Sequence, residues 1–205
     1  MPRLLPLLAA AALACASACS TTGAGRAPAE PTLAETIDAQ IAKDEAMPWT
    51  ARRLLTWADF KAKPRVDTGP VAAETAYTLL HGATCKGSTF EYKVVAAFRP
   101  GDSWVRPAML RTPADSARAL KHEQTHFDLT EVHARRLRRY FSELMAPCRL
   151  STSDLAGAAE RIGRDEKAAQ AQYDAETANG RTAAQQARWE KDVASQLVAL
   201  AKYTR

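Results

Sequence analysis

The sequence predicts an α+β fold in which a small antiparallel sheet is followed by three helices. Two observations support this prediction. Short β-compatible segments separated by turn residues occupy residues 71–106, and long helical patterns with capping residues follow from Thr112 onward. Because the strands come first and the helices afterwards, an α+β arrangement is favoured over a parallel sheet built from βαβ units.

The strands are expected in three segments. Val71–Leu80 contains Val, Thr and Tyr and follows the turn signal Gly69-Pro70. Phe90–Phe98 alternates in part between apolar and polar residues, and Lys86-Gly87-Ser88 can form the turn that joins these two strands. Ser103–Arg106 is expected to add a short third strand.

The first helix after the sheet has a clear N-terminal signal. Thr112 can cap it, Pro113 suits its first turn, and Asp115 lies where a capping box places its acidic partner. We expect this helix to end near Met145. Its apolar residues recur at helical spacing: Leu120, Phe127, Leu129, Val132, Leu137 and Phe141.

Further helices are expected on both sides of this one. Ser153–Ala178 is a helical segment closed by Asn179-Gly180, which suits a left-handed helix stop. Thr182–Tyr203 forms the last helix. A short helix near Leu33–Ala46 is expected to precede the strands.

The N-terminus has the features of an export signal. Arg3 supplies the positive charge, and residues 4–13 form an apolar segment too short to span a bilayer. Ala16-Ser17-Ala18-Cys19 resembles a bacterial lipobox, although Ala16 stands where Leu is usual. We therefore expect Cys19 to be lipidated, with ordinary signal-peptidase cleavage and secretion as the alternative.

The expected organisation is a signal peptide at 1–18, a flexible tether at 19–33 and a single domain at 34–205. The expected location is the periplasm, with an outer-membrane anchor through the lipid. Because the chain has a modest net charge of +5 and no nucleic-acid-binding motif, we expect no nucleic-acid partner. We interpret one basic run as a solvated helix face: Arg135, Arg136, Arg138 and Arg139.

Two cysteines, Cys85 and Cys148, lie outside the signal region. An exported chain meets an oxidising compartment, so these two are predicted to form a disulfide. It would close a loop of about 60 residues and stabilise the fold by about 2–4 kcal/mol. A pair of free thiols is the alternative.

The clearest chemical signal is an HExxH motif, formed by His122, Glu123 and His126. Residues four apart share one face of a helix, so the two imidazoles can bind one Zn²⁺. Glu123 lies beside the first histidine and can act as a base towards a zinc-activated water. The capping signal, the export signal and the uncharged residues inside the motif strengthen this interpretation over two surface histidines with a carboxylate.

A catalytic zinc needs a third protein ligand. His133 shares the face of His126 but lies about 10.5 Å further along the helix, so we interpret it as a surface or supporting residue. Asp174 and Glu176 in the next helix are better oxygen donors, and Asp174 is preferred. Tyr173 is expected to hydrogen-bond a developing oxyanion. The alternative is an ordinary polar helix end.

Several ordered motifs resemble those of a bacterial family, the domain-of-unknown-function family 922. They lie between Trp49 and Trp189: Leu55–Phe60, Ser103–Val105, Leu120–Asp128, Tyr173–Thr177, Gly180-Arg181, and Gln186 with Trp189. Members of this family look like secreted zinc-dependent proteases. The resemblance implies a metallopeptidase helix in which His122 and His126 bind zinc and Glu123 is the base. It also accounts for Asp128, where other protease motifs prefer an apolar residue.

We therefore expect a zinc-dependent metallopeptidase of the bacterial cell envelope that hydrolyses peptide or protein substrates. The strand at Phe90–Phe98 is expected to pair with an extended substrate. The alternative is a non-catalytic envelope lipoprotein that binds a metal or a partner. One departure from the family favours this alternative, because Asn179 stands where the family often has His.

Overall fold

The computed structural model describes residues 30–66 and 71–204, and the fold is α+β as predicted. The predicted signal peptide, the lipidated Cys19, most of the tether and the Gly69-Pro70 turn lie outside the described residues. None of the helices in the described part of the chain is long and apolar enough to cross a bilayer.

A long β-hairpin forms the main sheet. Strands β3 (Tyr77–Lys86) and β4 (Thr89–Phe98) pair along their whole length. They are joined by a two-residue loop whose first residue, Gly87, has a φ of 62°, as a tight hairpin turn requires. The short strand β1 (Met47–Pro48) pairs with the far end of β4, so that β4 is the middle strand.

A second, two-stranded sheet lies beside the hairpin, formed by β2 (Ala73–Glu74) and β5 (Trp104–Val105). The single strand predicted at residues 71–80 is therefore divided between two sheets. Ser103 accounts for the division, because its buried hydroxyl accepts a hydrogen bond from the backbone N–H of Ala76 at 2.9 Å. The same hydroxyl donates to the carbonyl of Arg99 at 2.8 Å, so the chain is fixed where it passes from one sheet to the other.

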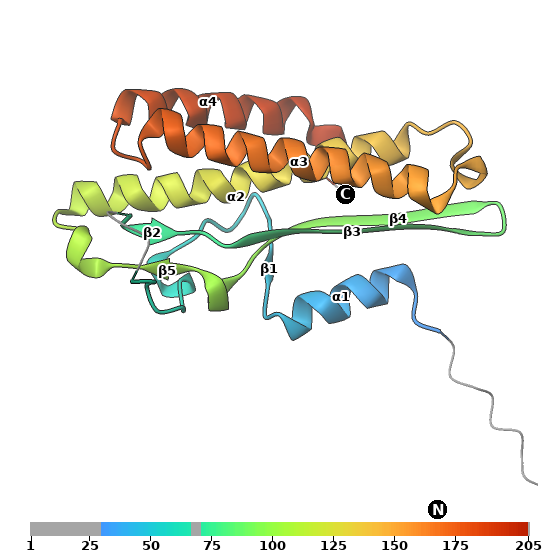
Figure 1. The fold of residues 1–205 in the computed structure, drawn as a ribbon, viewed down its shortest axis with the longest axis horizontal. Helices are drawn as coiled ribbons and strands as arrows, with labels where there is room; N and C mark the ends of the chain where they lie inside the picture. Colours follow the sequence, from blue (N-terminus) through green and yellow to red (C-terminus); the bar gives the residue numbers. More distant parts are fainter. Residues whose placement is uncertain (1–29, 67–70, 205) are drawn as a thin grey trace, which may run out of the picture. The chain divides into compact units, whose positions relative to one another are not determined.

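The described residues form four α-helices, α1 (Leu33–Lys43), α2 (Pro113–Ser142), α3 (Thr152–Thr177) and α4 (Ala183–Ala199). Three of them begin with a side-chain cap, supplied by Thr32, Thr112 and Ser151, as local sequence dictates. Figure 1 shows α2, α3 and α4 on one side of the hairpin and α1 on the other. Three helices thus follow the strands, as predicted.

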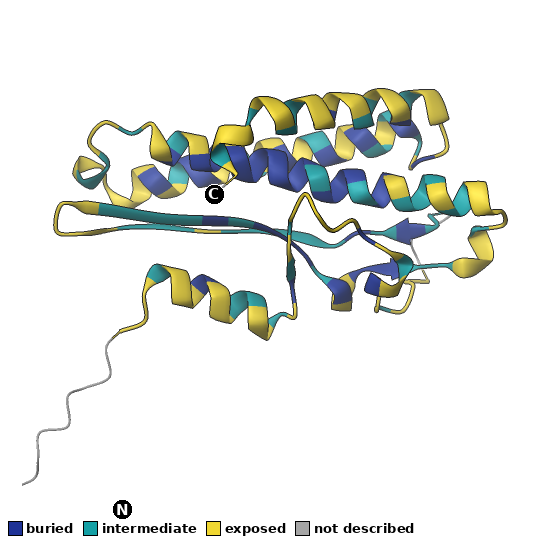
Figure 2. Ribbon diagram, turned by 180° about the vertical axis from the view of Figure 1, so that it is seen from behind, coloured by how far each residue is buried: buried dark blue, intermediate teal, exposed yellow. Residues whose placement is uncertain are grey.

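Helix α2 is the centre of the domain, packed against β4, α3 and α4. Its apolar residues enter three separate clusters, with Phe127 against Phe98, Leu137 against Val94 and Val132 against Val193. Figure 2 shows that α2 is buried over much of its length. Because neighbours surround it, polar residues on α2 are buried as well.

The basic run on α2 includes buried residues. The interpretation of this run as a solvated helix face is therefore wrong for two of its four arginines. Arg136 and Arg139 are exposed, but Arg135 and Arg138 are buried. Both buried guanidiniums bind the carboxylate of Glu131 at 2.9 Å, which offsets the cost of removing the charges from water.

The predicted disulfide between Cys85 and Cys148 is present. It links the end of β3 to the 3₁₀ turn between α2 and α3, across 63 residues of sequence. The disulfide therefore ties the tip of the hairpin to the helical layer.

Candidate metal site

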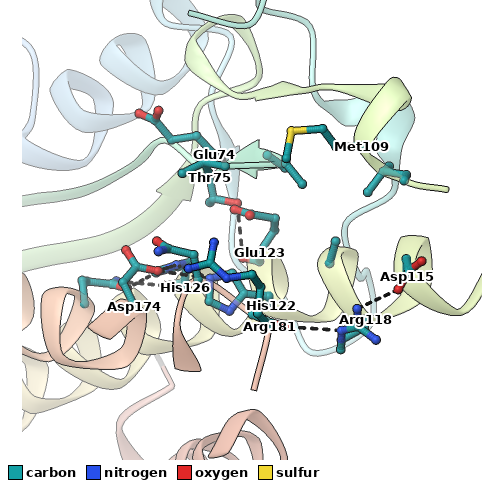
Figure 3. A pocket seen from close by; sticks show the side chains of 18 of the residues that line it. Glu74, Thr75, Met109, Asp115, Arg118, His122, Glu123, His126, Asp174 and Arg181 are labelled. Atoms are coloured by element: carbon teal, nitrogen blue, oxygen red, sulfur yellow. Dashed lines mark hydrogen bonds and ion pairs between the residues drawn. The ribbon is translucent and has the colours of Figure 1, made fainter. Parts of the chain in front are cut away.

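Two histidines of α2 and one aspartate of α3 come together where these two helices pack (Figure 3). The Nε2 atoms of His122 and His126 lie 3.2 Å apart. Asp174 Oδ1 lies 3.1 Å from His122 Nε2 and 3.0 Å from His126 Nε2. Both histidines are buried, and Asp174 is partly exposed.

The spacing of these three donor atoms fits a zinc ion. In a tetrahedral site with bonds of about 2.0–2.1 Å, neighbouring donors are about 3.3 Å apart. The observed separations of 3.0–3.2 Å are close to this edge length. Two imidazole nitrogens and one carboxylate oxygen also form a donor set that zinc accepts, so the group can supply three corners of a tetrahedron.

Gln170, one helical turn before Asp174, fixes the orientation of His126. Its Nε2 donates to the carbonyl of His126 at 2.9 Å and to the hydroxyl of Thr130 at 3.2 Å. Its Oε1 must therefore face His126 Nδ1, 2.6 Å away, and accept a hydrogen bond from it. With its hydrogen on Nδ1, His126 presents the lone pair of Nε2 to a metal.

Tyr173 lies behind the histidines. Its ring stacks on His122 with centroids 4.5 Å apart and meets His126 edge-on at 4.9 Å. The residue has no exposed surface and does not line the cavity described below. This position does not fit the predicted hydrogen bond to an oxyanion, because the hydroxyl is enclosed. It fits a residue that holds the two imidazoles in place.

The charges of the site are arranged for a cation. Burial on its own would raise the pKa of Asp174, but hydrogen bonds from His122 and His126 outweigh it and lower that pKa well below its usual range. Burial would lower the pKa of His126, but Asp174 and Glu123 raise it instead. The carboxylate is thus held ionised between two imidazole rings.

Two other residues considered as ligands lie elsewhere. Glu176 accepts hydrogen bonds from Trp189 Nε1 and Gln172 Nε2, both at 2.8 Å, and joins α3 to α4. His133 donates from Nδ1 to the carbonyl of Leu129 at 2.9 Å and accepts at Nε2 from Arg136 at 3.1 Å, and it does not belong to the metal group. It is buried rather than a surface residue, because the face of α2 that carries it is covered.

A cavity of about 820 Å³ lies in front of the three donors. Helices α2 and α3 form one wall, and the segment Val71–Thr75, which contains β2, forms the opposite wall. The hydroxyl of Thr75 donates to the backbone carbonyl of Glu123 at 3.3 Å and joins the two walls (Figure 3). No residue of β4 lines the cavity, so the expectation that Phe90–Phe98 pairs with a substrate does not fit the structure.

Glu123 lines the cavity beside His122, and its Oε2 atom is buried with no hydrogen-bond partner among the described residues. A buried carboxylate oxygen without a partner is costly, and such groups are concentrated at functional sites. Because Glu123 lines the cavity and Tyr173 does not, this atom is the buried, unpartnered oxygen nearest to a molecule bound there.

Two other residues of the motif have a structural purpose. Asp128 accepts hydrogen bonds from Trp49 Nε1 at 2.7 Å and from Gln124 Nε2 at 2.8 Å. Gln124 Oε1 in turn accepts from the backbone N–H of Leu55 at 2.8 Å. These bonds attach the segment before the sheet to α2, which explains a buried carboxylate at a position where an apolar residue would otherwise pack.

The structure brings four further residues to the site: Gln170, Tyr77, Arg118 and Arg181. The sequence holds a signal for Gln170 and Arg118, because each lies four residues before a candidate ligand on the same helical face. Arg181 belongs to the shared Gly180-Arg181 motif, which marks the position without assigning it a role. Tyr77 has no such signal, since its position depends on how the strand packs.

Comparison with known proteins gives one match. The sequence pattern of a family described as "Bacterial protein of unknown function (DUF922)" matches residues 49–181. No curated protein and no solved structure shows significant similarity to the chain.

Proposed function

The chain belongs to this bacterial family, DUF922, whose function is unknown, and on the geometry of the site we propose that it is a zinc-dependent peptidase of the bacterial cell envelope. One observation carries the proposal. His122, His126 and Asp174 converge with donor spacings that suit zinc, and Glu123 faces the same cavity with a buried, unpartnered oxygen.

Zinc held by these three residues would supply Lewis-acid activation of a water molecule. Glu123 is the base that takes a proton from the attacking water and later gives it to the leaving amine. Its unpartnered Oε2 suits both tasks, because no hydrogen bond within the described protein competes for it. Gln170 keeps the proton of His126 on Nδ1 during the reaction.

We propose Tyr77 as the group that stabilises the negative charge on the substrate oxygen, because its side chain lines the cavity and carries a hydroxyl donor. Burial raises the pKa of its phenol, as do the charges of Glu166 and Asp174. A phenol that holds its proton at neutral pH can donate a hydrogen bond to an oxyanion. In this proposal Tyr77 takes the role that the sequence suggested for Tyr173.

The edge of β2 can hold an extended peptide. The backbone bond from Arg106 N to Ala72 O sets the alternation of the β2–β5 ladder. The backbone groups of Ala73 and Thr75 therefore point away from β5, towards the wall of the cavity. A peptide could add there as a strand, which favours a protein or peptide substrate over a small molecule.

The test compares the purified protein with His126→Ala and Glu123→Gln. We expect about one zinc per wild-type chain, none in His126→Ala, and full zinc with activity lowered at least about 100-fold in Glu123→Gln. Activity would be measured on a mixed peptide library by mass spectrometry. Absence of zinc from the wild type after reconstitution would refute the proposal.

The alternative is a non-catalytic envelope protein that keeps the metal for binding or structure, which is favoured by Asn179 in place of the family's frequent His. It predicts zinc in the wild type without cleavage of any library peptide. It also predicts that Glu123→Gln leaves the protein's behaviour unchanged, because a structural metal needs no base.

The envelope location rests on the N-terminal sequence and is supported by the disulfide, which suits an oxidising compartment. We propose that the chain is anchored through lipidated Cys19. Radiolabelled palmitate should enter the wild-type protein and not Cys19→Ala. Soluble wild-type protein in the periplasmic fraction, without label, would instead indicate simple secretion.

A further inference from the structure

The cavity is longer than a zinc site requires, and its two ends differ. Helices α2 and α3 run antiparallel beside it, because His126 lies against Gln170 and Arg118 against Gly180. Arg118 therefore lies at one end of the cavity and Lys167 at the other, with the metal group between them. Met109 and Leu110 also line the end near Arg118.

One end carries two arginines. Arg118 is held in place by Asp115 Oδ1 at 2.7 Å and by the carbonyl of Gly180 at 3.2 Å (Figure 3). Arg181, the residue after Gly180, is exposed and lines the cavity. Within the described residues it forms no ion pair or hydrogen bond. Asp115 neutralises only one guanidinium, so this end keeps a positive charge.

The direction of β2 assigns this end to the C-terminal side of a bound peptide. A strand added antiparallel to β2, the more stable kind of pairing, runs opposite to Val71–Thr75. Val71 lines the cavity with Met109, so such a peptide ends near Arg118.

We infer that Arg181, supported by Arg118, binds a carboxylate on the C-terminal side of the bond that is cleaved. The inference rests on the proposed peptidase function and names its substrate class. Arg118 lies about 6 Å before His122 along α2, and an extended peptide advances about 3.3 Å per residue. The carboxylate therefore belongs to about the second residue after the bond, as an acidic side chain or as the free C-terminus.

The test uses peptides with a hydroxamate, a group that anchors on zinc and fixes their register without cleavage. Four compounds carry two residues after the hydroxamate: Leu-Glu amide, Leu-Gln amide, Leu-Lys amide and Leu-Gln with a free carboxylate. Their affinities would be measured by calorimetry on the zinc-loaded wild type and on Arg181→Gln. The control is Arg164→Gln, which removes an equally exposed arginine from the outer part of α3.

We expect the wild type to bind the Leu-Glu amide about tenfold more tightly than the Leu-Gln amide, the lower end of the range for a hydrogen bond to a charged group. The preference should disappear in Arg181→Gln and persist in Arg164→Gln. If only the compound with a free carboxylate binds more tightly than the Leu-Gln amide, the subsite recognises the C-terminus of a chain and not an acidic side chain. Equal binding of all four by the wild type would overturn the subsite alone, whereas no binding of any hydroxamate would overturn the peptidase as well.

Discussion

Gly180 offers the sharpest test of the metal site, through the substitution Gly180→Ala. Its φ is 76°, and an added Cβ would lie 3.1 Å from His122 Cγ and 3.3 Å from Gln186 Oε1. Gly87 at the hairpin tip has a similar φ of 62°, but an added Cβ would meet nothing within 4 Å. Gly87→Ala is therefore a matched control, because both substitutions force a left-handed backbone and only Gly180→Ala presses on His122.

The backbone strain of alanine in this conformation is about 1–2 kcal/mol, so both variants should lose about that much stability. At Gly180 the contact also requires His122 to move by a few tenths of an ångström. Changes to groups that orient a metal ligand typically lower metal affinity about 10–100-fold. We expect Gly180→Ala to lower the zinc affinity about 10-fold, and Gly87→Ala to leave the zinc affinity unchanged.

Stability would be measured by urea unfolding with a chelator present, and zinc affinity by competition with a chromogenic chelator. Comparing the two variants separates strain from the effect on His122. Equal zinc affinities for both variants would refute the reasoning, because they would show that the ring of His122 does not hold the metal or does not depend on Gly180.

Three further predictions concern the scaffold. Replacing Cys85 and Cys148 by Ser should lower the free energy of unfolding by about 2–4 kcal/mol, measured in urea, and reductant should lower the wild type to the same value. Arg138→Met should cost about 3–5 kcal/mol in urea unfolding, because Glu131 keeps its buried charge with one partner fewer, whereas Arg139→Met, which removes an exposed arginine of the same run, should leave the free energy of unfolding almost unchanged. Burial raises the pKa of the Glu166 carboxyl in the folded protein. The unfolded chain therefore loses the proton of Glu166 at a lower pH than the folded protein does. As the pH rises above about 4.3, the contribution of Glu166 to the free energy of unfolding decreases. Glu166→Gln should therefore be more stable than the wild type at pH 7 and equal to it at pH 4; a constant difference across this range would contradict the assignment.

The fold could be predicted largely because its signals are local. Thr112 and Pro113 define the start of α2 through backbone preferences that need no tertiary contact. Asn179 and Gly180 favour the left-handed backbone that ends α3 in the same way, although this backbone begins one residue earlier, at Ala178. The division of the segment at 71–80 into β2 and β3 could not be predicted in this way. It depends on Ser103, which is distant in sequence and reaches Ala76 only in the folded chain.

The candidate site also combines residues that local sequence places together with residues that only the folded chain brings close. His122 and His126 share a helix, so their spacing alone places them together. The sequence offers both Asp174 and Glu176 as oxygen donors, and of these two the packing of α3 on α2 brings only Asp174 to the histidines. Tyr173 lies next to Asp174 in sequence, but one step along a helix turns a side chain by about 100°. Its ring therefore lies behind the ligands while the carboxylate faces the cavity.

The positions of the three donors also affect how Asn179 is interpreted, the residue that stands where the family often has His. His122, His126 and Asp174 already provide three donors, and a catalytic zinc needs its fourth position open. A fourth protein ligand at position 179 would close the site rather than complete it. Asn179 has a φ of 52°, a conformation that asparagine adopts more readily than most residues, so its presence has a backbone explanation. The missing histidine therefore weighs less against a peptidase than the sequence alone suggests, and Glu123 is the residue whose replacement separates the proposed peptidase from a non-catalytic metal protein.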